Sequence, residues 1–230
     1  MFRHLGVVAA FVLSLAAGSG HAQTVPTDLC ASGPRLYLAG QLKAAFRVFM
    51  NCAIAGDSAS QYSAAMMMRS GESNDDGSDN LFGARVFLEQ SALQGYTQAI
   101  YALAKEYDVG SPAFRRDLKQ ATELFRKAAL QGHVDAQVDF ATQYLLGRGG
   151  VPQDDGVAAH WYERAARAGH WGAQFLIASM YERGHGVSRD EVVALHWYER
   201  ARDGGDEVAP LKVEQLKLRL ATKNRQLRLD

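Results

Sequence analysis

The sequence has few cysteines, little proline and no excess of charge of either sign. Two cysteines and five prolines occur in 230 residues, and 25 Lys and Arg residues balance 25 Asp and Glu residues to a formal net charge of zero. A nucleic-acid-binding domain typically presents a clustered basic surface, so this balance gives no support for a nucleic-acid partner. After the first segment, no apolar run approaches the roughly 18 residues of a membrane-spanning helix, and we expect no stable membrane span in the mature chain.

Motifs of common hydrolases are also missing. The sequence contains no S-x-x-K and no G-x-S-x-G, which carry the nucleophile of serine enzymes, and no H-E-x-x-H, which binds zinc. The triplet Gly56-Asp57-Ser58 resembles the start of some lipase motifs, but Gly56 belongs to a repeat described below. We therefore expect no catalytic residue, no cofactor and no enzymatic activity.

Histidines recur at matching places in the chain, His133 with His170 and His160 with His196. A zinc ladder is conceivable, yet no cysteine or paired carboxylate accompanies them at ligand spacing. Surface histidines of a repeat are the favoured interpretation, and no metal site is predicted.

The N-terminal segment MFRHLGVVAAFVLSLAAGSGHAQ has the pattern of a secretory signal peptide. Arg3 supplies the positive charge, an apolar run follows from Leu5 to Ala17, and small residues precede a predicted cut after Ala22. We expect a signal peptide at residues 1–22 and a periplasmic or secreted product, with an uncleaved anchor as the alternative.

The two cysteines, Cys30 and Cys52, form an even pair in a chain that we expect to be exported. Disulfides persist in oxidising compartments, so a Cys30–Cys52 bond is predicted, and two unpaired buried thiols are the alternative.

A glycine recurs at intervals of 36 to 39 residues, which is the period of stacked repeats. Alanine or serine follows four residues later, and a second glycine ends the next helical segment. Two apolar stripes at helical spacing lie in each unit, which we name helix A and helix B. The hexapeptide HWYERA occurs twice on helix B, at His160–Ala165 and His196–Ala201. The recurring glycines are Gly56, Gly95, Gly132, Gly169 and Gly205.

The pattern A-x-x-x-[LIF]-A-x-x-Y-x-x-G-x-G-V-x-x-D-x-x-x-A-x-x-W-Y-x-x-A-A-x-x-G is read from Ala136 to Gly169, with Gly150 as one extra residue, and from Ala173 to Gly205, with Arg202 in place of the second alanine. It resembles the Sel1-like repeat, a relative of the tetratricopeptide repeat. The resemblance implies an all-α, right-handed α-solenoid of antiparallel helix pairs over residues 23–209. Its units are expected at about 34–59, 60–98, 99–135, 136–172 and 173–209. Some secreted cysteine-rich members of the family bind or hydrolyse β-lactams, but they carry a cysteine pair in each repeat, unlike this chain.

Both ends of a helical stack need atypical units. Residues 210–230 hold Val213, Leu216 and Leu220 at helical spacing together with six basic residues. We expect a C-terminal capping helix with a basic outer face, and docking of an acidic partner or anionic lipid is the alternative. The acidic insertion Ser70–Asn80 is expected to be a solvated loop, with calcium binding through Asp75, Asp76 and Asp79 as the alternative.

With no enzyme motif, the predicted function lies on the concave surface lined by helix A. The mixed apolar and polar character of this surface suits an extended peptide or a partner helix. We expect a protein-interaction scaffold with protein partners in a bacterial cell envelope; a cell-wall or β-lactam hydrolase and a glycan- or peptidoglycan-binding module are the alternatives. Packing between units is the alternative for Val138 and Phe175. The candidate residues are Tyr101, Lys105, Asp108, Val138, Thr142, Leu145, Phe175, Ser179 and Glu182.

Overall fold

The computed structural model describes residues 27–72 and 78–226, and these residues form helices with a single isolated β-bridge and no named strand. The predicted signal peptide at residues 1–22 lies outside the described residues, as do Asp75 and Asp76 of the proposed calcium loop. The helices are α2 (Thr27–Leu38), α3 (Leu42–Ile54), α4 (Ser58–Ser70), α5 (Leu81–Leu93), α6 (Thr97–Val109), α7 (Leu118–Leu130), α8 (Val134–Leu146), α9 (Asp155–Arg167), α10 (Trp171–Arg183), α11 (Glu191–Asp203) and α12 (Ala209–Gln226).

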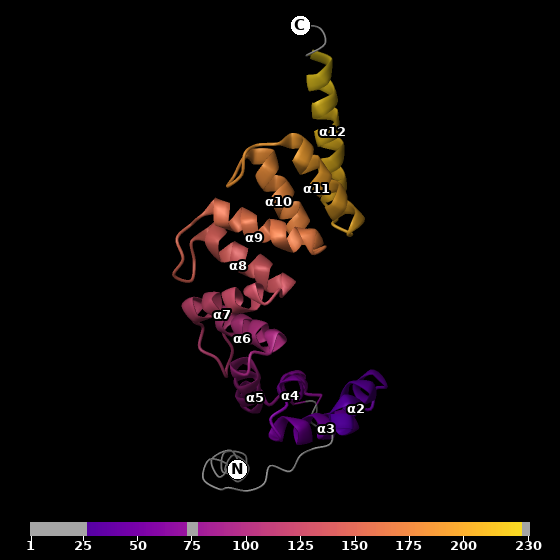
Figure 1. Cartoon of the computed structure of the whole chain (residues 1–230), viewed down its shortest axis with the longest axis vertical. Helices are drawn as coiled ribbons and strands as arrows, with labels where there is room; N and C mark the ends of the chain where they lie inside the picture. The colour runs from indigo at the N-terminus through magenta and orange to yellow at the C-terminus, as the bar shows by residue number, and fades with distance from the viewer. Residues whose placement is uncertain (1–26, 73–77, 227–230) are drawn as a thin grey trace.

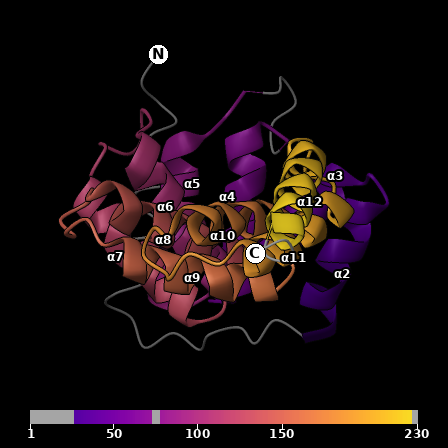
Figure 2. The same cartoon turned by 90° about the horizontal axis from the view of Figure 1, so that it is seen from above.

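The helices stack in chain order into an elongated, curved column with α2 near one end and α12 at the other (Figure 1). Each helix packs on the helix before it and the helix after it. Seen from above, the stack turns as it rises, so that α7 and α8 lie on one side and α2, α3 and α12 on the other (Figure 2). The predicted all-α repeat solenoid is confirmed: α4, α6, α8 and α10 are helices A, and α5, α7, α9 and α11 are helices B.

The helices A begin two residues before the predicted unit boundaries, because the residue after the recurring glycine already caps the next helix. The first pair departs more from expectation. Its unit was expected to begin near residue 34, whereas α2 begins at Thr27 and contains Pro34 within the helix. A proline removes one backbone donor, and α2 runs through it.

Every helix B ends at the recurring glycine with the same pair of hydrogen bonds. At the end of α7, the amide of Gly132 donates to the carbonyl of Ala129 and the amide of His133 donates to the carbonyl of Ala128. This pair of bonds is the Schellman motif, which needs a left-handed residue at the glycine position, and Gly132 has a φ of 93°. The same two bonds recur at Gly56, Gly95, Gly169 and Gly205. The repeat period therefore follows from local turn chemistry.

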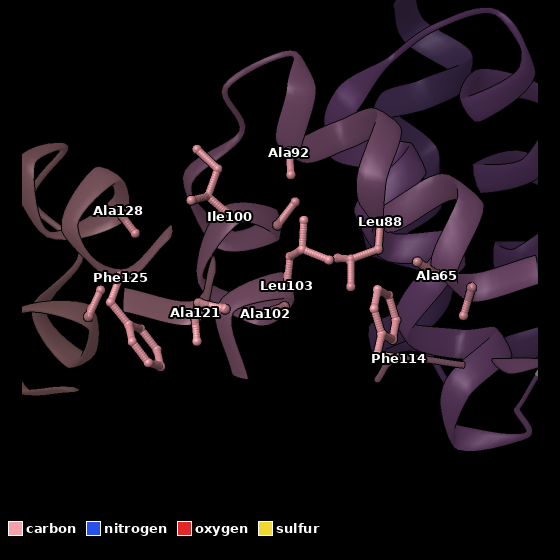
Figure 3. Packing of buried hydrophobic residues seen from close by; sticks show 14 of the residues in the cluster. Ala65, Leu88, Ala92, Ile100, Ala102, Leu103, Phe114, Ala121, Phe125 and Ala128 are labelled. Carbon is pink, nitrogen blue, oxygen red and sulfur yellow. The ribbon is translucent and has the colours of Figure 1, made fainter. Parts of the chain in front are cut away.

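Alanines and large side chains alternate in the core between the helices. Around α6 and α7, Leu103, Phe125 and Leu88 fill the space beside small residues such as Ala102 and Ala121 (Figure 3). Small residues let helix backbones approach closely, and the larger side chains then fill the interior at normal packing density. One buried cluster passes into the next along the column, with Tyr144 and Trp161 in contact with both of the larger clusters.

The repeated hexapeptide HWYERA is a packing unit. Tyr162 and Tyr198 are fully buried, Trp197 is buried, and Trp161 is half-buried against Phe140. The histidines of the hexapeptide, His160 and His196, are exposed. The aromatic pair of each copy is thus part of the packed interior, and the histidine is not.

The first and last helices of the described stack are held by different interactions. At the first end, the predicted Cys30–Cys52 disulfide is present and joins α2 to α3. At the last end, α12 lays Val213 and Leu216 against α11 and α10. Three basic side chains of α12 form ion pairs with the neighbouring helices: Lys212 and Arg219 with Glu182 of α10, and Lys217 with Glu199 of α11.

Candidate functional site

The nine predicted partner-binding residues lie on three consecutive helices A, α6, α8 and α10, and all nine are half-buried. They therefore occupy the boundary between the packed interior and solvent rather than an open surface. The structure brings them together in groups, one group for each helix, and the contacts of each group differ.

On α6, two of the predicted residues contact the next repeat. The hydroxyl of Tyr101 donates to Oδ2 of Asp139 at 3.1 Å, and Nζ of Lys105 lies 3.3 Å from the same oxygen. Asp139 is on α8, so these bonds join successive helices A. Burial, followed by the nearby charge of Asp139, raises the pKa of the Tyr101 phenol. The third residue, Asp108, accepts a bond from Nε of Arg116 through its backbone carbonyl.

On α8, the predicted residues face the interior more than expected. Val138 and Leu145 pack against the second core cluster. The hydroxyl of Thr142 donates to the carbonyl of Val138 and lies 2.8 Å from the hydroxyl of Tyr162. Val138 therefore packs between helices, which is the alternative that the sequence left open for it.

On α10, Phe175 forms an edge-on contact with Tyr198 at 5.2 Å between ring centres, and Ser179 is half-buried. Glu182 accepts bonds from the Tyr198 hydroxyl, from Lys212 and from Arg219. Burial of Glu182 raises the pKa of its carboxyl, but these three hydrogen bonds outweigh burial and leave the pKa below its ordinary value. Two of the three donors belong to α12, so Glu182 serves to anchor the capping helix.

Two histidines cap helices A, a role that the sequence analysis missed. Nδ1 of His133 accepts the amide of Ala136 at 3.3 Å, and Nδ1 of His170 accepts the amide of Ala173 at 3.0 Å. Asp57 does the same for α4 through its carboxylate. The available signal was position, because each histidine directly follows the recurring glycine, as Asp57 does. Both histidines therefore have a structural role as well as a place on the repeat surface.

His133 also contacts the predicted binding face, because its ring stacks on Tyr101 with ring centres 4.2 Å apart. Burial lowers the pKa of the His133 imidazole, against the opposing charges of Asp135 and Asp139. A protonated Nδ1 could not accept the Ala136 amide, so capping requires the neutral ring. The helix A face at α6 and α8 is thus linked to the protonation state of His133.

We predict that the free energy of unfolding decreases as pH falls below about 6.5, the ordinary pKa of histidine in an unfolded chain. The folded state has the lower pKa, so its stabilisation is complete above 6.5 and is lost as pH falls through the folded value. His133→Asn keeps a capping oxygen that does not titrate, and it should remove about 1 kcal/mol of this pH dependence, the usual value of an N-cap.

The measurement is urea denaturation at neutral and mildly acidic pH, followed by circular dichroism. His160→Asn is the control, because His160 is exposed and caps no helix. Equal pH dependence in the wild type and in His133→Asn would contradict the assignment.

Within residues 27–72 and 78–226, no three His, Cys, Asp or Glu side chains are grouped so that they could hold a metal ion. None of the described helices is both long enough and apolar enough to cross a membrane.

A family model of the Sel1 repeat matches the chain at residues 97–133, 134–170 and 171–206. A Sel1 repeat protein from Oxalobacter formigenes is 31% identical, with 76% of this chain and 49% of that one covered and a TM-score of 0.69. The c5321 protein, a protective antigen of uropathogenic Escherichia coli strains with an SLR fold, is 26% identical over 90% of this chain and 43% of its own, with a TM-score of 0.75.

The immunity protein Pa5087 of Pseudomonas aeruginosa shares the fold alone, at 16% identity and a TM-score of 0.51, with 82% of this chain and 70% of that one covered. The chain spans less than half the length of the Oxalobacter and Escherichia proteins. No curated protein sequence matches the chain.

Proposed function

Because this chain is a Sel1 repeat protein, with three repeats over residues 97–206, we propose that it is an exported scaffold that binds a protein partner in a bacterial cell-envelope assembly. The partner lies along the helix A face of α6, α8 and α10. Sel1 repeat solenoids are commonly non-catalytic interaction scaffolds, and a helical stack offers an extended surface to a partner.

The observation that carries the proposal is the linkage of successive helices A. Tyr101 and Lys105 of α6 both bond to Asp139 of α8, and Glu182 of α10 is bonded to α12. These contacts hold side chains of different repeats in fixed relative positions before any partner arrives. A preformed surface loses less conformational entropy on binding than a flexible one, which supports a role in recognition.

Export is supported by two features. The Cys30–Cys52 disulfide suits an oxidising compartment such as the periplasm, and the N-terminal sequence has the pattern of a signal peptide. An exported chain does not meet proteins of the cytoplasm. Its protein partner is therefore expected in the cell envelope.

The test is photocrosslinking in the native cells, with benzoylphenylalanine placed at Asp108 or at Leu145. Both residues are half-buried on helices A; the Asp108 side chain makes no hydrogen bond or ion pair among those described, and Leu145 packs with only part of its side chain against the second core cluster. Lys127, exposed on helix B of α7, is the matched control position. We expect one envelope protein to crosslink from both helix A positions and not from Lys127.

Crosslinks that form only from Lys127 would move the binding surface to helix B and contradict the proposal. Retention of glycan fragments with no crosslinked protein would replace the scaffold with a glycan-binding module.

A further inference from the structure

The turn between α6 and α7, residues 110–117, differs from the other turns between helix A and helix B. In the two later repeats, glycines bring the turn close to the preceding helix B, as Gly149 does beside Thr122. Here Ala113 and Phe114 are buried in that place instead. The sequence of this turn is GSPAFRRD, in which two arginines stand just before Asp117 and the start of α7.

Arg85 of α5 fixes this turn onto the preceding repeat. Nη1 of Arg85 donates to the carbonyl of Ala113 at 2.6 Å, and the guanidinium carbon lies 4.9 Å from the centre of the Phe114 ring. Its Nε also pairs with Glu89 at 2.9 Å. The guanidinium of Arg85 is therefore held in place by three contacts, and the turn that carries the two further arginines is held with it.

A hollow of about 400 Å³ lies where α5, α6 and the turn before α7 meet. Arg85, Tyr107, Arg115, Arg116 and Asp117 line it. Tyr107 packs edge-on against Phe114 with ring centres 5.4 Å apart, which gives the hollow an aromatic wall. It lies at the turns between helices A and B and includes none of the nine residues of the proposed partner-binding face.

The arginines of the hollow are incompletely paired. Arg115 and Arg116 are exposed, and neither has a carboxylate partner among the described residues. Nε of Arg116 donates only to the neutral carbonyl of Asp108. By contrast, Arg189, which occupies the Arg116 position in the last repeat beside Gly184, is paired with Glu191 at 2.6 Å.

Charge around the hollow leaves a single positive excess. Its three arginines face Glu89, which pairs with Arg85, and Asp117, whose carboxylate caps α7 by accepting the amide of Gln120. A singly charged carboxylate balances this excess, whereas a doubly charged phosphate would leave one uncompensated negative charge beside Asp117. Arginine also binds carboxylates through two parallel hydrogen bonds.

We propose that this hollow is a second binding site, which takes an acidic side chain from a peptide segment of a partner protein. Arg115 and Arg116 bind the carboxylate, and the Tyr107 wall contacts an apolar neighbour in the peptide. The site goes beyond the proposed scaffold function, because none of its lining residues belongs to the helix A face, which it adjoins at Asp108. Its position on the edge of the column would let it hold a segment that leaves that face.

The test uses a fluorescent peptide of alternating Glu and Leu residues, with a Gln and Leu peptide as the uncharged probe. Binding to the full chain is measured by anisotropy. Arg115→Gln should weaken binding of the acidic peptide by about tenfold, in line with loss of a hydrogen bond to a charged group. Arg148→Gln removes the same charge from an exposed arginine in the next turn and should change affinity by less than about twofold.

Equal losses in Arg115→Gln and Arg148→Gln, or equal affinity for both peptides, would overturn the proposal in favour of general charge attraction. Binding of phosphatidylglycerol vesicles that depends on Arg115, without binding of the acidic peptide, would overturn it in favour of a lipid surface. Both variants should keep the helical circular dichroism of the wild type. Loss of the helix A crosslinks would leave this result unchanged, so the two proposals fail independently.

Discussion

Replacing Gly186 with alanine is expected to lower the free energy of unfolding of the last repeat by about 2–5 kcal/mol. Two costs add at this position. Gly186 has a φ of 69°, which is unfavourable for a residue with a side chain. In addition, a Cβ there would collide with backbone atoms of Asp155 and lie 2.7 Å from the amide nitrogen of Gly156. Backbone atoms in the first turn of α9 cannot move aside as a flexible side chain can.

Gly169→Ala separates the two costs. Gly169 has a φ of 96°, but a Cβ added there meets no atom within 4 Å. Only the backbone cost of about 1–2 kcal/mol should remain. The three tryptophans all lie on the last two helix pairs, at Trp161, Trp171 and Trp197, so their fluorescence during urea denaturation measures this end of the column. Equal destabilisation by both substitutions would show that the contact with α9 contributes nothing.

Loss of the Cys30–Cys52 disulfide, in a Cys30→Ala and Cys52→Ala double variant, is expected to destabilise the first helix pair by about 3 kcal/mol. The bond closes a loop of 22 residues in sequence separation, and the chain-entropy model gives about this value for such a loop. The effect should be local, because each unit of a stack contacts only its neighbours. Among the described helices, α2 packs chiefly on α3, so it depends on this contact and on the disulfide.

Hydrogen exchange followed by mass spectrometry measures this effect. Amides of α2 and α3 should exchange faster in the double variant, while those of α10 and α11 should exchange as in the wild type. Addition of reductant to the wild type should reproduce the variant. Equally faster exchange along the whole column would contradict a local role, and unchanged exchange in α2 would show that packing alone holds it.

Much of the fold was predictable because its signals are local. The glycine that ends each helix B, the aspartates that begin α7, α9 and α11, and the aromatic and alanine stripes all act within a few residues of their own positions. The proposed binding face was predictable only as a set of helix positions. Thr142 faces Tyr162 and Glu182 faces α12, because the neighbouring helices turn these side chains toward the interior.

By itself, the sequence determined the helix pairs, their period and the pairing of the two cysteines, since backbone conformation and turn chemistry depend on nearby residues. Only the tertiary structure decided which charges meet. Lys212 and Arg219 pair with Glu182 because the fold places α12 beside the end of α10, His133 stacks on Tyr101 because α6 lies beside α8, and Arg115 keeps no carboxylate partner among the described residues. The two contacts of Glu182 join residues 30 and 37 positions apart in the chain, so they form only when the folded stack brings those residues together.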